Sequence, residues 1–215
     1  MLSCKKRFER LLLLVAVFLI LFSFYSCFSG SRKTIDEENL QEELNIIPVI
    51  GEGPSYFSLI NQDSQLVTHK LFEGKIWVTD FFFTTCPTIC PRMSDQMARL
   101  RDTFLSEQKV MLLSHTIDPE HDRPYILKKY LEKLGGGLNK WQMVTGEKDT
   151  IYDLAEKYAI SVQADESAPG GFIHSGAFVL IDQQGKIRGY YDGTKEKEVN
   201  KLIRDIRKLL VSDYN

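Results

Sequence analysis

Two cysteines in the middle of the chain, Cys86 and Cys90, are placed where they could act together. They follow residues 76–83, a β-branched and aromatic run that predicts a strand buried on both faces of a sheet. Pro87 suits the first turn of a helix, where its missing N–H is not needed. Because a helix N-terminus favours a thiolate, we expect reactive thiols displayed at the start of a helix.

The spacing of these cysteines allows either a metal site or a disulfide. Residues four apart on a helix have Cβ atoms about 5 to 6 Å apart, close enough for both sulfurs to bind one metal. A disulfide needs Cβ atoms about 3.5 to 4.5 Å apart, so the start of the helix would have to adjust. A C-x-x-C pair would indicate a dithiol oxidoreductase, but this chain has one more residue between its cysteines. The spacing therefore favours metal without excluding the disulfide.

Thiolates narrow the choice of metal. Two soft sulfur ligands suit Cu(I), and an added imidazole would let the site accept Cu(II) as well. A structural zinc site normally takes four Cys or His ligands, which makes zinc a weaker candidate. Two buried, inert thiols are a further alternative, although a proline-rich helix start makes their full burial awkward.

Of the four histidines, His174 is the best candidate for a third ligand. It lies in a glycine-containing loop directly before the strand expected at residues 178–181. In a thioredoxin-type sheet, the loop at this place passes beside the helix start that carries the cysteines. His115 ends a predicted strand, while His69 and His121 lie in polar surroundings that indicate the surface.

Three other side chains near the cysteines have competing interpretations. Met93 and Met97 share a helical spacing with Leu100 and Phe104, so we assign the methionines to the core rather than to copper. Asp80 interrupts the apolar run before the cysteines. It is either a buried carboxylate that tunes the thiols or a position that faces water, and the sequence leaves both open.

Strands and helices alternate along the rest of the chain and end in a hairpin followed by a helix. This order predicts an α/β sandwich of the thioredoxin type, with a central sheet flanked by helices. Strands are expected at residues 110–116, 142–145, 178–181 and 186–191, and helices at residues 93–104, 124–134, 148–158 and 195–210.

Length and composition limit the kind of protein. The chain has 215 residues, 43% of them hydrophobic and 26% charged, with a formal net charge of -2. One domain with a substantial core is the expectation, and nothing in this balance suggests disorder or binding to nucleic acid.

Residues 1–29 have the layout of an export signal, with basic residues before an apolar run from Leu11 to Phe22. The basic residues favour an orientation that places the rest of the chain outside the cytoplasm. Cys27 resembles the lipid-modified cysteine of bacterial lipoproteins; a retained transmembrane helix and a released protein are the alternatives. Residues 30–52 predict an acidic tether, and residues 53–215 the thioredoxin-like domain.

Three segments resemble one known family. Residues 81–91 are similar to the cysteine motif of the Sco/SenC copper chaperones for cytochrome c oxidase, residues 116–124 to that family's aspartate-proline turn, and residues 173–185 to its histidine segment. The resemblance covers roughly residues 53–210. The stretch between residues 160 and 174 is shorter than the family pattern.

The resemblance implies a thioredoxin fold and copper, as Cu(I), Cu(II) or both, bound by Cys86, Cys90 and His174. It implies a copper-containing oxidase subunit as partner, to which this protein supplies copper or whose cysteines it reduces. It also implies a second partner, which is a copper donor or a thiol reductant. We expect a membrane-tethered monomer that is a metallochaperone rather than an enzyme. The alternative is a thiol-disulfide reductase that uses Cys86 and Cys90 as a redox pair without metal. A thiol peroxidase ranks last. Proteins of that kind resemble one another in a Thr three residues before the reactive Cys, and this chain has Phe83 at that position.

Overall fold

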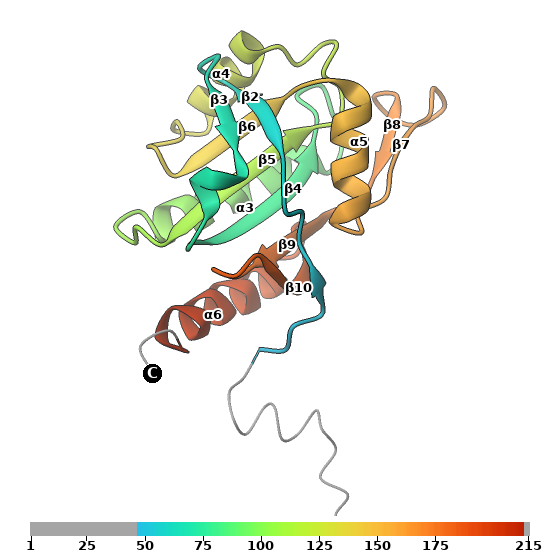
Figure 1. The fold of residues 1–215 in the computed structure, drawn as a ribbon. Helices are drawn as coiled ribbons and strands as arrows, with labels where there is room; N and C mark the ends of the chain where they lie inside the picture. The colour runs from blue at the N-terminus through green and yellow to red at the C-terminus, as the bar shows by residue number, and fades with distance from the viewer. Residues whose placement is uncertain (1–46, 213–215) are drawn as a thin grey trace, which may run out of the picture. The chain divides into compact units, whose positions relative to one another are not determined.

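A mixed sheet of eight strands organises the structure, a computed structural model that describes residues 47–212. The strand order is β1-β10-β9-β4-β5-β6-β2-β3, in which β4, β5 and β6 are parallel neighbours and the other pairs are antiparallel (Figure 1). A separate ribbon pairs β7 with β8. The strands are β1 (Gly51–Glu52), β2 (Ser58–Asn61), β3 (Leu66–Thr68), β4 (Ile76–Phe82), β5 (Val110–Thr116), β6 (Trp141–Thr145), β7 (Val162–Ala164), β8 (Phe172–His174), β9 (Ala177–Ile181) and β10 (Lys186–Asp192).

Helices cover both faces of this sheet. The ring of Phe81 lies 6.0 Å from that of Tyr158 at the end of α5, whereas Phe82 lies 5.6 Å from Tyr130 of α4. Neighbouring strand residues point to opposite faces, so α4 and α5 cover opposite faces. Figure 1 shows α5 in front of the sheet and α3 behind it. The helices are the 3₁₀ turn η1 (His69–Phe72), α3 (Cys90–Thr103), α4 (Pro124–Lys133), α5 (Lys148–Lys157) and α6 (Glu196–Ser212).

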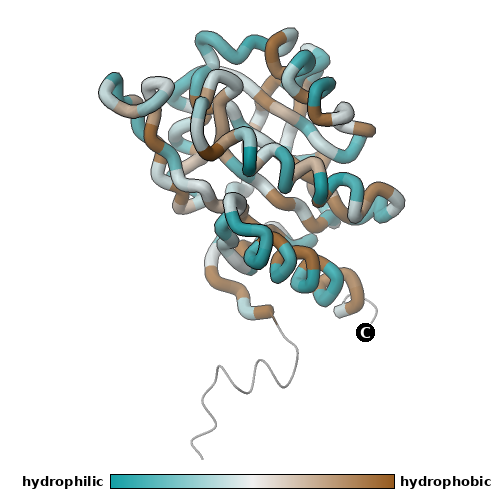
Figure 2. Tube along the Cα trace, turned by 180° about the vertical axis from the view of Figure 1, so that it is seen from behind, coloured by the Kyte–Doolittle hydropathy of each residue, from teal (hydrophilic) through white to brown (hydrophobic). Residues whose placement is uncertain are grey.

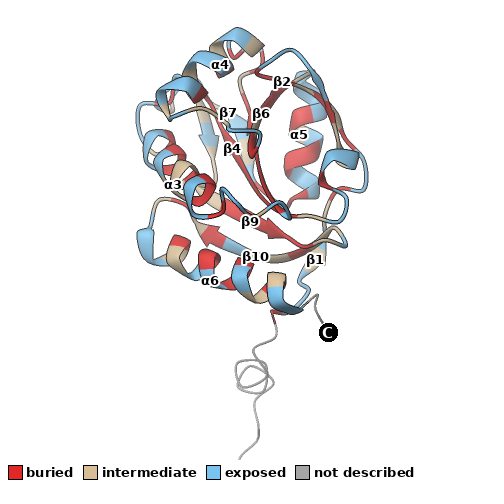
Figure 3. Ribbon diagram, turned by 90° about the vertical axis from the view of Figure 1, so that its left-hand side faces the viewer, coloured by how far each residue is buried: buried red, intermediate tan, exposed pale blue. Residues whose placement is uncertain are grey.

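The core lies along the two central strands. Every residue of β4 and β5 is buried, as expected of parallel strands covered on both faces (Figure 3). The closing helix α6 buries one stripe of apolar residues and exposes the other side, and Figure 2 shows this alternation along the helix that ends beside the C-terminus. The thioredoxin-like α/β fold predicted from the sequence is therefore confirmed.

One helix begins later than the cysteine spacing suggested. We expected the helix to start near Cys86, but α3 begins at Cys90, and Pro87 lies in the preceding turn. Pro91 gives the reason, because a proline beyond the first turn would lack an N–H for the helix and would clash with an earlier carbonyl. Only one of the two cysteines is therefore helical.

The N-terminal predictions concern residues that the structure largely omits. The export or anchor segment 1–29, with Cys27, and most of the tether 30–52 lie outside the described residues. Gly51 and Glu52, at the end of the predicted tether, pair with β10 as strand β1. In residues 47–212, no helix is both long and apolar enough to cross a membrane.

Candidate metal centre

The three predicted metal ligands come together beyond the carboxyl end of β4. Cys86 lies in the turn after this strand, where its backbone N–H donates to the carbonyl of Phe83 at 3.3 Å. Cys90 is the first residue of α3, and His174 is the last residue of β8. One ligand atom from each of the three lies within 4.8 Å of the other two.

Two contacts set the orientation of the His174 ring. Its Nδ1 lies 3.1 Å from the backbone oxygen of Ser175. A carbonyl oxygen can only accept, so Nδ1 carries the proton and Nε2 keeps its lone pair. That Nε2 lies 3.3 Å from the sulfur of Cys90. The ring is therefore held in the form that can bind a metal, with its free nitrogen facing a thiol.

Both thiols are buried, which corrects the expectation that they are displayed. The exposed fraction is 7% for Cys86 and 0% for Cys90. Aromatic rings close the site, because Phe83 lies 5.1 Å from Phe172 and 5.8 Å from His174, centroid to centroid. The β7–β8 ribbon carries two of these three rings, so the ribbon covers the cysteines.

The ribbon also corrects the expectation of a loop around His174. This residue ends strand β8, paired with Val162 of β7. The turn between the two strands packs tightly on the cysteine segment, since a Cβ on Gly170 would lie 2.7 Å from the Phe83 ring and 3.2 Å from Pro87. Gly170 also has a φ of 82°, a conformation that glycine adopts readily.

The environment separates the two cysteines chemically. Burial acts to raise the pKa of Cys86, but hydrogen bonds from Thr88 and from Cys90 outweigh burial and lower that pKa below its ordinary value. The pKa of Cys90 is raised strongly, chiefly by burial. Burial also lowers the pKa of His174, which keeps the imidazole neutral. In the metal-free protein, Cys86 is thus the cysteine that loses its proton more readily, and Cys90 is the one that keeps its proton.

Asp122 positions the cysteine segment, a role that sequence reasoning missed. Its fully buried carboxylate accepts hydrogen bonds from the backbone N–H of Thr84 at 3.0 Å and from the Thr116 hydroxyl at 2.6 Å. The Thr84 hydroxyl and the ring of His121 also contact it. Asp122 was noticed only as part of the aspartate-proline turn, because nothing in the local pattern shows that the turn reaches Thr84.

The other histidines lie away from the cysteines. His121 is half exposed and contacts Asp122, and His69 lies beside Phe57. His115 is fully buried and stacks on Phe81 with ring centroids 4.7 Å apart. Burial lowers the pKa of His115 to about 4, so this ring stays neutral. None of these three belongs to the metal-ligand group formed within the described residues.

The remaining sequence alternatives near the cysteines are resolved by burial. Met93 and Met97 are fully buried in the core, as predicted from their spacing. Asp80 is 2% exposed and accepts a hydrogen bond of 2.5 Å from Ser114, so the water-facing interpretation is wrong. Burial raises the pKa of Asp80 to about 7, and its charge is felt at Cys90.

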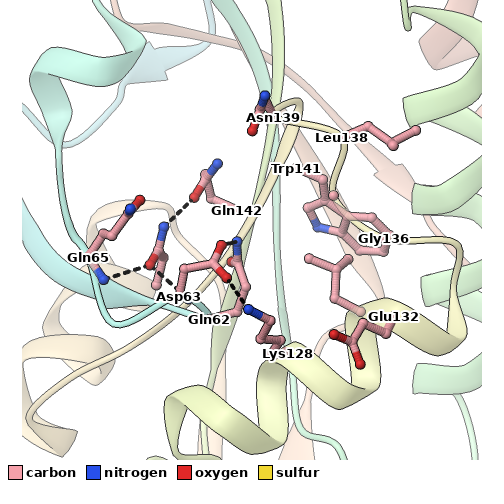
Figure 4. A pocket seen from close by; sticks show the side chains of 13 residues that line it. Gln62, Asp63, Gln65, Lys128, Glu132, Gly136, Leu138, Asn139, Trp141 and Gln142 are labelled. Atoms are coloured by element: carbon pink, nitrogen blue, oxygen red, sulfur yellow. Dashed lines mark hydrogen bonds and ion pairs between the residues drawn. The ribbon is translucent and has the colours of Figure 1, made fainter.

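A polar cavity of about 160 Å³ lies at the opposite end of the parallel strands, beside the start of β6 (Figure 4). Several of the side chains around it interact with one another. Asn61 donates to Gln142 at 2.8 Å, and Lys128 forms an ion pair with Asp63 at 3.0 Å. None of the residues that line this cavity belongs to the metal-ligand group formed within the described residues.

The donor set at the cysteines fits copper. Two sulfurs and one imidazole nitrogen form a three-ligand set of the kind that soft Cu(I) accepts, and the nitrogen also suits Cu(II). Metal–sulfur and metal–nitrogen bonds of about 2.3 and 2.0 Å would place the ligand atoms up to about 4 Å apart. The observed limit of 4.8 Å therefore requires only a small contraction around an ion.

Comparison with solved structures finds the same fold in three informative relatives. A SCO1/SenC family lipoprotein from Bacillus anthracis is 32% identical, with a TM-score of 0.69, and the match covers 75% of this chain and 97% of that one. BsSco, described as a member of the Sco family of cytochrome c oxidase assembly proteins with a disulfide switch, is 28% identical, with a TM-score of 0.63 and coverages of 75% and 95%. Arabidopsis thaliana ScoI, solved with copper bound, is 25% identical, with a TM-score of 0.61 and coverages of 74% and 99%.

The sequence also matches a family model. The model described as SCO1/SenC matches residues 52–211, which include all three candidate ligands and strands β2 to β10. This match extends over most of the chain and agrees with the structural relatives. The chain belongs to the SCO1/SenC family.

Proposed function

We propose that this protein binds one copper ion through Cys86, Cys90 and His174 and serves the assembly of the copper centre of a cytochrome c oxidase. The observation that carries the proposal is the convergence of three suitable ligand atoms within 4.8 Å. The relatives support the choice of metal and of pathway, because ScoI from Arabidopsis thaliana was solved with copper and BsSco is described as an oxidase assembly protein.

Anaerobic copper titration of the reduced protein, with chelator competition, tests the site. One tight copper ion per chain is expected, and His174→Ala should weaken it by at least tenfold, or about 1.4 kcal/mol. Cys86→Ser and Cys90→Ser should each weaken it too. His69→Ala is the matched control, because this histidine lies beside Phe57 and outside the ligand group. Unchanged copper retention in His174→Ala would exclude the three-ligand site.

A second candidate function is thiol-disulfide reduction by the same cysteines. The lowered pKa of Cys86 and the raised pKa of Cys90 favour it, since the cysteine that ionises more readily can attack and the other can resolve. Cys86 would attack a partner disulfide to form a mixed disulfide, and Cys90 would then release the partner as two thiols while this chain becomes oxidised. Both electrons come from the cysteine pair, and a thiol reductant must restore it.

The His174→Ala variant separates the two functions. A reductase does not need the imidazole, so this variant should reduce a disulfide substrate at nearly the normal rate. Copper delivery should fail in the same variant. Activity is therefore measured in parallel by release of substrate thiols and by transfer of copper to the reduced oxidase subunit.

We also propose that the domain is tethered to the membrane on its extracytoplasmic side. The basic and apolar segment 1–29 supports this, as does the description of the Bacillus anthracis relative as a lipoprotein. If Cys27 carries the lipid, Cys27→Ser should remove the lipid mass and move the protein from the membrane fraction to the soluble one. Retention of Cys27→Ser in the membrane would support a transmembrane anchor instead.

A further inference from the structure

The outer edge of β10 is open along the second half of the strand. On one side, β10 pairs with β9 along most of its length, as far as Asp192. On the other side, β1 pairs only with Lys186 and Ile187. Among the described strands, none pairs with this outer edge from Gly189 to Asp192. An extended edge of this kind presents backbone N–H and C=O groups to any chain that lies alongside it.

A groove of about 440 Å³ lies at the end of β10, where Tyr190, Tyr191 and Asp192 line it. Ile89 lines one wall and directly precedes Cys90. Ser175 lines another and directly follows His174. Tyr190, which is 41% exposed, lines the groove from β10. A chain that occupied the groove would therefore lie against the two segments that hold the metal ligands.

Two small residues, Gly176 and Ala177, line the groove, so a backbone can approach closely there. A Cβ on Gly176 would lie 3.3 Å from Thr194 and 3.7 Å from Ile89. A larger side chain at position 176 would therefore crowd Thr194 and Ile89, which also line the groove. Gly176 does not have a positive φ, so another residue can adopt its backbone conformation. The effect of a substitution there therefore depends on the space available to the side chain.

The groove offers no unpaired charge. Its carboxylate, Asp192, pairs with Lys195 at 2.8 Å and accepts hydrogen bonds from the backbone N–H and hydroxyl of Thr194. What remains is apolar surface and backbone hydrogen-bonding groups. This combination fits an extended segment with small or apolar side chains, recognised by addition of a strand to the sheet.

We infer that the open edge of β10 and the adjoining groove dock an extended, cysteine-bearing segment of the copper-accepting partner as an added strand. The inference rests on the proposed function, because the residues next to Cys90 and His174 line the groove, and this adjacency identifies the occupant. Docking there brings the partner's thiols to the buried site from the side that the β10 edge leaves open. The opposite edge of the sheet, β3, has no metal ligand near it and provides an internal control.

Amide hydrogen exchange tests the docking on the unaltered, copper-loaded protein. The probe is the purified copper-centre domain of the cytochrome c oxidase from the same organism, with its cysteines reduced. Mixing should slow exchange in the segment from Gly189 to Asp192 by at least tenfold and leave Leu66–Thr68 of β3 unchanged. Transfer of copper without any protection at β10 would overturn the inference.

A pair of glycine variants provides an independent measurement. Gly176→Val fills the groove and should slow copper transfer at least tenfold while copper stoichiometry stays the same. Gly51→Val is the matched control, because its Cβ would lie at an ordinary 3.6 Å from Ile187 on β1, at the other end of β10. Equal transfer rates in the two variants would contradict the inference. If Gly176→Val fails to fold, the exchange measurement on the unaltered protein decides.

The same measurements distinguish other occupants of the edge. Protection in the protein alone that rises with its concentration would assign the edge to a second copy, and protection independent of concentration would assign it to the chain's own N-terminal segment. Either result overturns the inference. If the protein binds no copper, the proposed function is refuted instead. Amide hydrogen exchange in the presence of the oxidase domain still shows whether docking occurs.

Discussion

The carboxylate of Asp122 accepts a 3.0 Å hydrogen bond from the backbone N–H of Thr84, a residue 38 positions earlier in the chain. Thr84 lies two residues before Cys86, and Asp122 is also tied to Thr116 at the end of β5. The cysteine turn is therefore anchored to the neighbouring strand by one buried carboxylate. The position of the first thiol depends on this anchor.

Replacing Asp122 by Ala should destabilise the protein and loosen the metal site. The change leaves the Thr84 N–H and the Thr116 hydroxyl without their acceptor, at a cost of about 2 to 4 kcal/mol in the free energy of unfolding. Copper affinity should fall with it, because Cys86 loses its fixed position. Urea unfolding and copper titration measure both effects. Asp102→Ala, which removes a carboxylate with 61% side-chain exposure, should change neither, and equal behaviour of the two variants would refute the anchor.

Two adjacent glycines test whether the ribbon must lie tightly on the cysteine segment. Gly170 and Gly171 have φ angles of 82° and 86°, so alanine at either costs about 1 to 2 kcal/mol. Only at Gly170 would the new Cβ also meet Phe83, at 2.7 Å; at Gly171 it meets nothing within 4 Å. Gly170→Ala should therefore lower copper affinity at least tenfold more than Gly171→Ala does. Matching affinities would show that His174 reaches the metal without this packing.

The two thiols should react at different pH values in the reduced, metal-free protein. The thiolate is the reacting form, and the pKa of Cys86 is lowered while that of Cys90 is raised. Alkylation of Cys86 by iodoacetamide should reach half its maximal rate at a lower pH in the folded protein than in the unfolded chain. Cys90 should stay unmodified across the same range. Peptide mass mapping measures each site, and unfolding the protein should abolish the difference.

Asp80 should make stability depend on pH. Its folded pKa of about 7 exceeds the ordinary value of 3.8, so between about pH 4 and pH 7 the folded protein holds a proton that the unfolded chain releases. This contribution is complete below pH 4 and is lost as the pH rises to 7. Asp80→Asn removes the titration, so its stability relative to the unaltered protein should rise by on the order of 3 kcal/mol from pH 5 to pH 8. Urea unfolding at four pH values measures the difference, and parallel curves would contradict the raised pKa.

Local sequence patterns were sufficient for most of the fold. The apolar run that became β4 and the helical spacing of Met93 and Met97 in α3 predicted their elements because each depends on which faces of one segment are buried. The cysteine pair was visible for the same reason, since its spacing is local. The position of His174 before a predicted strand made it the candidate for the third ligand, and the family resemblance agreed with that choice. The geometry of the described residues brings it to the cysteines.

Only the tertiary structure decided the contacts between segments that are distant in the sequence. Cys90 and His174 are 84 residues apart, and the covering of the thiols depends on how the β7–β8 ribbon packs against Phe83. The role of Asp122 and the burial of Asp80 likewise follow from neighbours on other strands. Periodicity records which side of a segment avoids water, but it does not record which segment covers that side. The chain by itself therefore determined the elements and the candidate ligands, whereas packing decided how closely those ligands meet and how far water is excluded from them.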